Sequence, residues 1–425
     1  MNAPGGTLRF SVIVASRRRG RSLKRTLRAV RQLDHSAFEV IVVGDEAARS
    51  AVDEVGAGWV RFVAFDEPNL SAARNLGISA SAGEICAFLD DDAIPEPTWL
   101  AHHQEALITR EAAASVGYVR GPDGIGFQSR AALVDHEAET HELALIGDNP
   151  CVPELPSGRA VKLVGTNMAV RRDALAAVGG FDPAYRYFLD DADISLRLRL
   201  AGCKAAVVPL AEVHHALAAS DLRMRNRAPK TLHETGRSTA IFLRRHPGAD
   251  LGAIRARVAS REWRRLERAL AKGTIEPRDM NRLMTTLEEG WEDGQSALLP
   301  DRPDLAESSE RFHRVAPWPP GHGVLTSRFF RRKAVLAQAT EEMNAVGRRM
   351  SVFSYSLTSW PHLVRYTEDG VWLHTGGQFH GKGLGLHGFR WCRFASCVDD
   401  EIARVANRRG FNDAGSLLWA GAANL

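Results

Sequence analysis

The chain has 425 residues, of which 44% are apolar and 25% are charged, and its formal net charge at pH 7 is +4. This length exceeds one typical hydrophobic core and predicts a chain of about two domains. The net charge is too small to indicate nucleic acid as a partner, and the absence of any run near 18 apolar residues argues against a membrane-spanning helix.

The cysteines and the first ten residues indicate the cellular compartment of the protein. The five cysteines are mostly far apart and lack the spacing of a metal knuckle, which fits reduced thiols in a cytosolic protein. Residues 1–10 lack the apolar core of a signal peptide. We therefore expect a cytoplasmic protein, at most peripheral on the inner face of a membrane.

The first half of the chain alternates short apolar runs with amphipathic stretches, which predicts a layered, mainly parallel α/β sheet flanked by helices. The segment 17–31 holds eight Lys or Arg and no acid. It is either a solvated helix face or a region that attracts an anionic substrate or membrane surface. The expected strands are Ser11–Ala15, Val40–Val43, Val60–Phe65 and Ile85–Leu89, and the expected helices are Ala72–Ala80 and Trp99–Ile108.

The next segment continues this alternation after an interruption. Residues 121–160 are rich in Gly, Pro and polar side chains and are expected to be irregular. We expect Ala218–Ser238, which is polar and basic, to be a mobile loop that closes over a bound ligand. The expected strands are Val116–Val119, Lys162–Val164, Met168–Arg171 and Ala205–Pro209, and the expected helix is Asp190–Leu200, closed by Gly202.

Beyond about residue 250 the pattern changes to helices rich in Arg and acids, then to a Pro-rich stretch. The sequence predicts helices at 251–271, 278–291 and 328–350, and short strands at 352–355 and 371–375. We therefore divide the chain into a main α/β domain over 1–245, a helical extension with a Pro-rich linker over 246–320, and a small C-terminal α+β module over 321–425.

Three carboxylates, Asp90, Asp91 and Asp92, directly follow the apolar run Ile85–Leu89. Adjacent anions cannot all be buried without a counter-charge, and a divalent cation bound through carboxylate oxygens would supply it. Because Asp45 also follows an expected strand, both sets of acids should lie at one edge of the sheet. An acidic turn in solvent is the alternative.

Several stretches of the first 220–240 residues occur in the order found in one enzyme family. Each is weakly specific alone, but together this half of the chain resembles the family 2 glycosyltransferases, which have the GT-A fold. The matching stretches are Ser11–Ser16, Glu39–Asp45, Ala73–Gly77, Phe88–Asp92, Gly165–Arg172, Gly179–Asp182, Asp190–Leu198 and His214.

The resemblance implies that Asp92 binds Mn²⁺ or Mg²⁺ and that Asp90 holds the donor's ribose or a metal-bound water. Such a cation would neutralise the charge on a departing diphosphate. His214, in preference to His215, matches the histidine that completes the metal site. Asp91 belongs to the same motif, although its side chain should point away from its neighbours because directions alternate along an extended segment.

Asp191 aligns with the general base, which deprotonates the acceptor hydroxyl in a single displacement that inverts the sugar's configuration. Asp190 stands where the family has Glu. An acid that caps the following helix is the structural alternative, and Asp190 or Asp193 would serve for that. In the family, the position of Gly44 often holds an acid that pairs with uracil, so the resemblance does not say which nucleobase the donor carries. The remaining residues implied to contact the nucleotide sugar are Ala15, Ser16, Asp45, Arg74, Gly165, Thr166 and Asn167.

The predicted function is thus a metal-dependent inverting glycosyltransferase that takes a sugar from a nucleotide diphosphate donor, with a glycan, lipid-linked or protein acceptor, in cell-surface polysaccharide or glycoconjugate synthesis. A related module that binds nucleotide or glycan without turnover is the main alternative. The segment Arg17–Gly20 lacks the Gly-rich loop of a nucleotidyltransferase or a dinucleotide-binding dehydrogenase. Arg331, Arg332 and Lys333 beside two phenylalanines would suit an anionic bilayer surface or form an ordinary basic helix.

Overall fold

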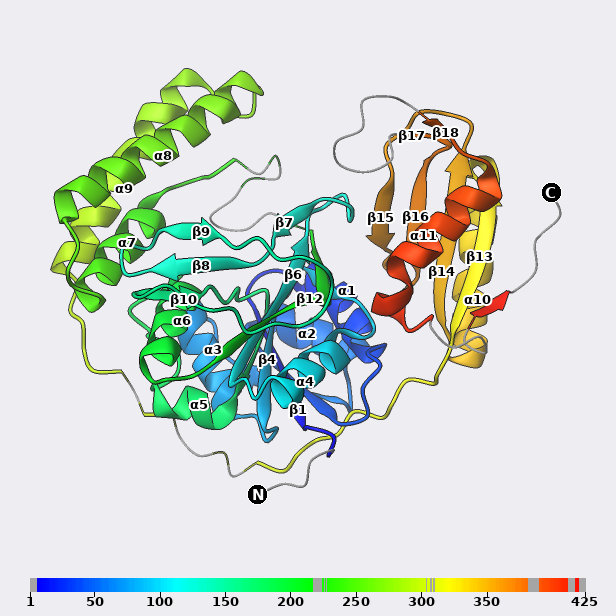
Figure 1. Ribbon diagram of the computed structural model, residues 1–425, viewed down its shortest axis with the longest axis horizontal. Helices are drawn as coiled ribbons and strands as arrows, with labels where there is room; N and C mark the ends of the chain where they lie inside the picture. The colour runs from blue at the N-terminus through cyan, green and yellow to red at the C-terminus, as the bar shows by residue number, and fades with distance from the viewer. Residues whose placement is uncertain are drawn as a thin grey trace.

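The computed structural model describes residues 6–216, 224, 226, 228–302, 304–305, 308, 310–380, 390–411 and 417–419. Its main sheet has nine strands, of which eight follow the order β3-β2-β1-β4-β11-β6-β12-β5, and β7 pairs with β6 (Figure 1). Only the pairings of β11, β5 and β7 are antiparallel, so the carboxyl ends of β1, β2, β4 and β6 share one edge. The strands are β1 (Phe10–Ser16), β2 (Phe38–Gly44), β3 (Val60–Ala64), β4 (Ile85–Asp90), β5 (Ala93–Pro95), β6 (Ala114–Arg120), β7 (Phe127–Ser129), β11 (Asn167–Arg171) and β12 (Ala205–His215).

Helices cover both faces of this sheet. One face packs against α1, α2 and α4 through a cluster that includes Leu27, Val52 and Trp99. The other packs against α3, α5 and α6 through a cluster that includes Ile78 and Ile194. The predicted layered, mainly parallel α/β architecture is confirmed. The helices are α1 (Gly20–Arg31), α2 (Glu46–Val55), α3 (Leu70–Ser79), α4 (Trp99–Thr109), α5 (Arg172–Ala177) and α6 (Asp190–Leu200).

The segment 121–160 is not irregular throughout, contrary to the prediction. Besides β7 it contains β8 (Ala132–Asp135), β9 (Thr140–Glu142) and β10 (Arg159–Val161), and the last three form a small antiparallel sheet. Strands of three or four residues are too short to produce a recognisable alternation, which is why the sequence did not show them. The strand expected at 162–164 is wrong: β10 ends at Val161, and residues 162–164 have no regular secondary structure.

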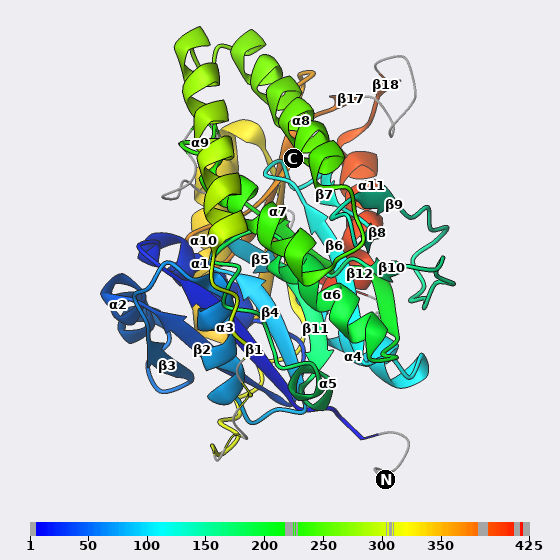
Figure 2. The ribbon, with the colours of Figure 1, turned by 90° about the vertical axis from the view of Figure 1, so that its left-hand side faces the viewer.

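Three helices follow the main sheet: α7 (His233–Arg245), α8 (Leu251–Ala271) and α9 (Pro277–Ser296). They share a core that includes Leu243, Leu266 and Leu287, and α8 and α9 project from the body of the molecule as a hairpin (Figure 2). Of the expected loop Ala218–Ser238, residues 218–223, 225 and 227 lie outside the described residues, and residues from 233 onward belong to α7.

The C-terminal module contains a sheet of order β15-β16-β14-β13-β19, with α10 on one face and α11 on the other. Only β15 is antiparallel to its neighbour. The helix expected over 328–350 is shorter, because both ends of that range belong to strands. The elements are β13 (His322–Arg328), the 3-10 turn η1 (Phe329–Arg331), α10 (Arg332–Val346), β14 (Arg349–Ser356), β15 (Leu363–Tyr366), β16 (Trp372–Gly377), β17 (Phe379–His380), β18 (Arg390–Trp391), α11 (Phe394–Arg409) and β19 (Leu417–Trp419).

The module is docked on the main domain by a buried ion pair and a shared apolar cluster. Nε of Arg409 lies 2.8 Å from Oε2 of Glu96, and both side chains are fully buried. Ile94 of β5 packs in one cluster with Tyr366 and Trp372 of the module. Strand β5, which carries Ile94, pairs directly with β12, the strand that carries His214 and His215. Among the described residues, no helix is long and apolar enough to cross a membrane.

Candidate functional site

Strand β4 delivers Asp90 to the carboxyl edge of the sheet, where its side chain keeps 29% of its surface exposed. The two acids that follow form a turn and are almost completely buried. Asp91 points inward, where Oγ of Ser16 donates a hydrogen bond to its Oδ2 at 2.7 Å. Burial raises the pKa of Asp91 to about 7, while the charge of Arg19 opposes the rise. The side chain of Asp91 therefore fixes the turn through a buried hydrogen bond, while that of Asp90 is partly exposed.

His215 completes a group of possible metal ligands with Asp90 and Asp92. One ligand atom from each of the three lies within 4.8 Å of the others, and Nε2 of His215 is 3.1 Å from Oδ1 of Asp92. Burial would lower the pKa of His215, but the hydrogen bond to Asp92 and the charges of both aspartates raise it instead. Two carboxylates and an imidazole form a donor set that suits Mn²⁺.

His214, the histidine expected at the metal, lies on the other side of β12. Its Nε2 is 2.9 Å from Oε1 of Glu96, and its ring packs against Trp372 of the C-terminal module at 5.0 Å between ring centroids. Adjacent strand residues point in opposite directions, so only one of two neighbouring histidines can reach the acids. The geometry brings His215, and not His214, to Asp90 and Asp92.

Arg19 was not singled out from the sequence, yet its guanidinium lies among the three acids. Nη1 is 2.9 Å from Oδ1 of Asp91, and Nη2 is 2.5 Å from Oδ2 of Asp92. Burial alone would lower the pKa of Arg19, but the charges of Asp91 and Asp92 raise it. The signal in the sequence was the basic run directly after β1, because that loop must lie at the same edge as Asp90.

The second pair of acids, Asp190 and Asp191, opens helix α6. Leu189 before them has a left-handed backbone (φ 66°), as does Phe188 (φ 75°), a conformation that costs free energy in residues other than glycine. This abrupt turn places both acids in the first helical turn, where the helix dipole favours negative charge. Burial raises the pKa of Asp190 to about 6, although the charge of Arg74 lowers it.

Arg74 of α3 joins the two acidic clusters. Its side chain is 6% exposed, its Nη1 is hydrogen-bonded to Oδ2 of Asp190, and its Nη2 is 3.7 Å from Oδ1 of Asp90. A Cβ atom on Gly165 would lie 2.1 Å from Nη2 of Arg74, so a larger residue there would require this guanidinium to shift. Arg74 is thus held between acids of both clusters.

The dipeptide Gly165-Thr166 also touches both clusters. The backbone N–H of Gly165 donates to Oδ2 of Asp191 at 3.3 Å, and the hydroxyl of Thr166 donates to Oδ2 of Asp90. Asp90 and Asp191, which are about a hundred residues apart in the sequence, therefore both contact the segment Gly165-Thr166. Asp191 is only partly buried and keeps an accessible face there.

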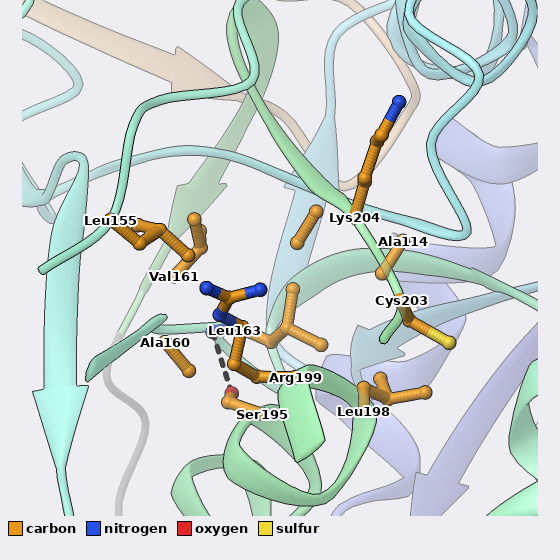
Figure 3. Close-up of a pocket in the computed structure, with 11 residues that line it drawn as sticks. Ala114, Leu155, Ala160, Val161, Leu163, Ser195, Leu198, Arg199, Cys203 and Lys204 are labelled. Atoms are coloured by element: carbon orange, nitrogen blue, oxygen red, sulfur yellow. Dashed lines mark hydrogen bonds between the residues drawn. The ribbon is translucent and has the colours of Figure 1, made fainter. Parts of the chain in front are cut away.

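Ser195, one turn further along α6, fixes this helix to the same segment. Its Oγ accepts a hydrogen bond from the backbone N–H of Leu163 at 2.9 Å and donates to the carbonyl of Asp191 (Figure 3). The small pocket drawn in Figure 3 lies against α6 and is lined mainly by apolar side chains, together with Ser195, Arg199 and Lys204. It contains none of the site acids.

Four other residues were predicted to contact the nucleotide sugar, and two of them, Asn167 and Asp45, have structural contacts. Asn167 is fully buried, and its amide bonds Trp99, His103 and the carbonyls of Tyr118 and Ala211, so it holds strands and α4 together. Asp45 caps α2 through Ala48 and accepts the N–H of Arg18 at 2.8 Å. Ala15 and Ser16 end β1 beside Asp90 and Gly44, at the edge where a nucleotide is expected.

Comparison with known proteins agrees with this arrangement. Residues 11–178 match the family described as glycosyl transferase family 2, a range that includes Asp90, Asp92 and Gly165. The chain carries a glycosyl transferase family 2 domain. The family 2 domain thus covers the sheet from β1 to α5, while α6, with Asp190 and Asp191, and β12, with His215, follow it.

Curated relatives match parts of the chain. The pre-mycofactocin glycosyltransferase of Mycobacterium tuberculosis is 28% identical over 214 residues, which is 48% of this chain and 42% of that protein. The N-acetylglucosaminyl-diphospho-decaprenol L-rhamnosyltransferase of the same species is 39% identical over 92 residues, 21% of this chain and 25% of that protein. The chain thus spans less than half of the length of these relatives. The solved structure of GalNAc-T7 with UDP, GalNAc and Mn²⁺ covers 56% of this chain, and the chain covers 48% of it, with 17% identity and a TM-score of 0.44.

Proposed function

We propose that the protein is a metal-dependent, inverting glycosyltransferase that moves a sugar from a nucleoside diphosphate donor to a hydroxyl group of an acceptor. Its role would be in the synthesis of a cell-surface polysaccharide or glycoconjugate. One relative is named as a transferase for a lipid-linked sugar, N-acetylglucosaminyl-diphospho-decaprenol, which supports this. The observation that carries the proposal is the contact of Gly165-Thr166 with both Asp191 and Asp90. A displacement reaction needs a base on one side of the sugar and a group that stabilises the leaving diphosphate on the other.

The metal would be held by Asp90, Asp92 and His215, whose ligand atoms lie close enough together for one ion. When bound, a Mn²⁺ or Mg²⁺ ion would neutralise negative charge on the departing diphosphate. Carboxylate oxygens are hard ligands of the kind that Mn²⁺ and Mg²⁺ bind, and one imidazole nitrogen is compatible with Mn²⁺, which supports the assignment.

Asp191 would accept the proton of the acceptor hydroxyl. Among the described contacts, its carboxylate has one hydrogen bond, a long one at 3.3 Å from Gly165, so an acceptor can still reach it. Asp190 is the poorer candidate, because its carboxylate is buried and bonded to Arg74. Arg74 would keep the two clusters in position and supply positive charge beside the diphosphate.

The nucleoside would lie at the ends of β1 and β2, against Ala15, Ser16 and Asp45. Both oxygens of Asp45 already accept backbone N–H groups, one of them from Arg18 in the loop after β1. Asp45 would therefore shape this loop as well as face the nucleoside. The donor sugar would lie against Gly165 and Thr166, and Asn167 is left out of the proposed site because its amide is fully engaged.

The test is donor binding followed by turnover. Thermal-shift measurements with UDP-, GDP- and dTDP-sugars, each with and without Mn²⁺, should show metal-dependent stabilisation by one nucleotide class. Asp191→Asn should keep that stabilisation but lose about 10²–10⁴-fold in transfer or donor hydrolysis. Asp173→Asn, which changes an acid in the first turn of α5, is the matched control. Stabilisation without any turnover by the wild type would favour a binding module instead of an enzyme.

A further inference from the structure

The carboxyl edge of the C-terminal sheet gathers exposed aromatic and aliphatic side chains. Phe330 is 82% exposed, Leu357 70%, and Trp360 and Trp391 51% each, while Phe379 is 39% exposed. Each follows the end of a parallel strand or lies in the β17–β18 pair. We call this surface, with the basic residues Arg331, Lys333 and Arg393, the basic aromatic edge.

Contacts between these side chains join them into one continuous surface. Phe379 and Trp391 are direct partners in the β17–β18 ladder, and the N–H of Phe379 donates to the carbonyl of Thr358 at 3.1 Å. From that loop, Trp360 reaches Phe329, with ring centroids 4.8 Å apart. Phe330 is the next residue of the same 3-10 turn. Solvent-exposed apolar surface that continues over several segments marks an interaction site.

The charge of this surface has a single sign. The segments 328–333, 356–362, 376–379 and 391–394, whose side chains the structure describes, contain five Lys or Arg and no Asp or Glu. Arg331, Lys333 and Arg393 are exposed, and the guanidinium of Arg332 lies 4.3 Å from the ring centroid of Phe329. The chain as a whole has a net charge of only +4, so this is a local concentration of positive charge.

The basic aromatic edge and the acidic site face the same side of the molecule. Strand β6 runs parallel to β4, with β11 between them, and rises towards β7 at the top of Figure 1. Strand β16 likewise leads to β17 at the top of the C-terminal module. A flat surface that contacted the basic aromatic edge would therefore lie on the side of the carboxyl ends of β4 and β6.

We propose that the basic aromatic edge docks the protein on an anionic phospholipid bilayer. Trp and Phe side chains favour the interfacial zone of a bilayer, and Lys or Arg beside them are attracted to anionic headgroups. A soluble polyanion would need the basic residues but would gain little from Phe330 and Leu357, which have no polar groups. Binding to a bilayer surface is stabilised both by insertion of apolar side chains and by attraction between basic side chains and anionic headgroups.

The experiment is co-sedimentation of the full chain with vesicles of phosphatidylcholine alone or with 30 mol% phosphatidylglycerol. The wild type should bind the anionic vesicles at least about tenfold better, and less well as salt is raised. Arg331→Glu with Lys333→Glu should weaken binding by at least about 25-fold, about fivefold for each basic residue. Phe330→Ser with Trp360→Ser should also weaken it, because insertion is lost. The control is Arg199→Glu with Leu200→Ser, an exposed basic and apolar pair at the end of α6, which should bind as the wild type does.

Equal binding of both vesicle types, or an equal loss in the control pair, would overturn the proposal. So would unchanged vesicle binding in the Phe330 and Trp360 double variant, since that result indicates a site for a soluble polyanion. Circular dichroism and the thermal midpoint of each variant show that it is folded. No nucleotide, metal or acceptor takes part, so the result stands apart from the proposed transfer activity.

Discussion

Nη2 of Arg19 lies 2.5 Å from Oδ2 of Asp92, so a guanidinium stands beside the carboxylate at which we propose a divalent cation binds. The other oxygen of Asp92 faces His215, whose pKa is raised by that same carboxylate against the effect of burial. Two basic side chains therefore compensate buried acids that would otherwise repel each other. An incoming cation must displace part of this positive charge.

Arg19→Gln should therefore bind Mn²⁺ more tightly than the wild type does, by about tenfold or more, because repulsion between the guanidinium and the ion is removed. The metal-free variant should also have a lower thermal midpoint, since Asp91 and Asp92 lose their nearest counter-charge. Isothermal titration calorimetry without nucleotide measures the first effect and thermal unfolding the second. The control is Arg21→Gln, which removes an equal charge from the start of α1, where Arg21 pairs with Glu368 in solvent. Weaker Mn²⁺ binding by Arg19→Gln would contradict competition.

The neighbouring histidines of β12 should give opposite results when replaced. His215→Ala should weaken Mn²⁺ binding by about tenfold or more and change stability little. His214→Ala should leave Mn²⁺ binding close to that of the wild type but lower the free energy of unfolding by about 1–3 kcal/mol, because Glu96 loses a hydrogen bond and Trp372 a packing partner. Calorimetry and urea unfolding on both variants separate the two roles. Loss of metal binding in His214→Ala alone would return the assignment to that residue.

Gly165→Ala tests the junction between the two acidic clusters. A Cβ atom at this position forces Arg74 to move, and the buried carboxylate of Asp190 then loses its ion pair. The free energy of unfolding should fall by about 3 kcal/mol or more, as expected when one partner of a buried pair is displaced. Gly252→Ala, in the exposed first turn of α8, should be neutral or slightly stabilising in the same urea titration. Equal stability of the two variants would show that Arg74 can move freely.

The periodic part of the fold was predictable from the sequence. Buried strands such as β1 and β4 are continuous apolar runs, and α8 and α9 have clear helical periodicity, so each appears in local sequence. The short strands β8 to β10 have only three or four residues each, too few to show an alternation, and α10 could not be separated from the strands on either side of it. The local sequence pattern of a strand does not show which other strand it pairs with.

The candidate site was predictable in position but not in detail. The acids at 90–92 and 190–191 and the glycine at 165 come from motifs, and all lie at one edge in the structure. The orientation of the two histidines depends on how β12 pairs with β5 and β6, which a single sequence does not state. The contact of Arg19 with Asp91 and Asp92 joins segments more than 70 residues apart. The basic run after β1 predicts positive charge at this edge, but it does not show which arginine meets the acids.

The buried histidine His374 predicts a pH dependence of stability at the junction with the C-terminal module. Nη1 of Arg409 donates to its Nε2 at 2.7 Å, so that nitrogen must be unprotonated, and Nδ1 is 2.7 Å from Oε1 of Glu401. Burial, followed by the charge of Arg409, lowers the pKa of His374 to about 4. An unfolded chain would bind a proton there at about pH 6.5. Between these values the unfolded state holds more protons, so the free energy of unfolding falls as pH decreases from about 6.5 to 4, by at most about 3 kcal/mol. Above pH 6.5 the residue contributes no pH dependence.

His374→Gln should therefore flatten the fall in stability between pH 6.5 and 4.5 relative to the wild type, as measured by urea unfolding at several pH values. His103, whose pKa burial also lowers to about 4, remains in both proteins, so the difference between their curves isolates His374. The lowered pKa values of Glu96 and Glu401 affect stability mainly below about pH 5, because above it those carboxylates are mostly ionised even when the chain is unfolded. If stability fell equally with pH in the variant and the wild type, His374 would bind a proton equally well in the folded and unfolded chain. That result would contradict the hydrogen bond from Arg409, which needs an unprotonated Nε2.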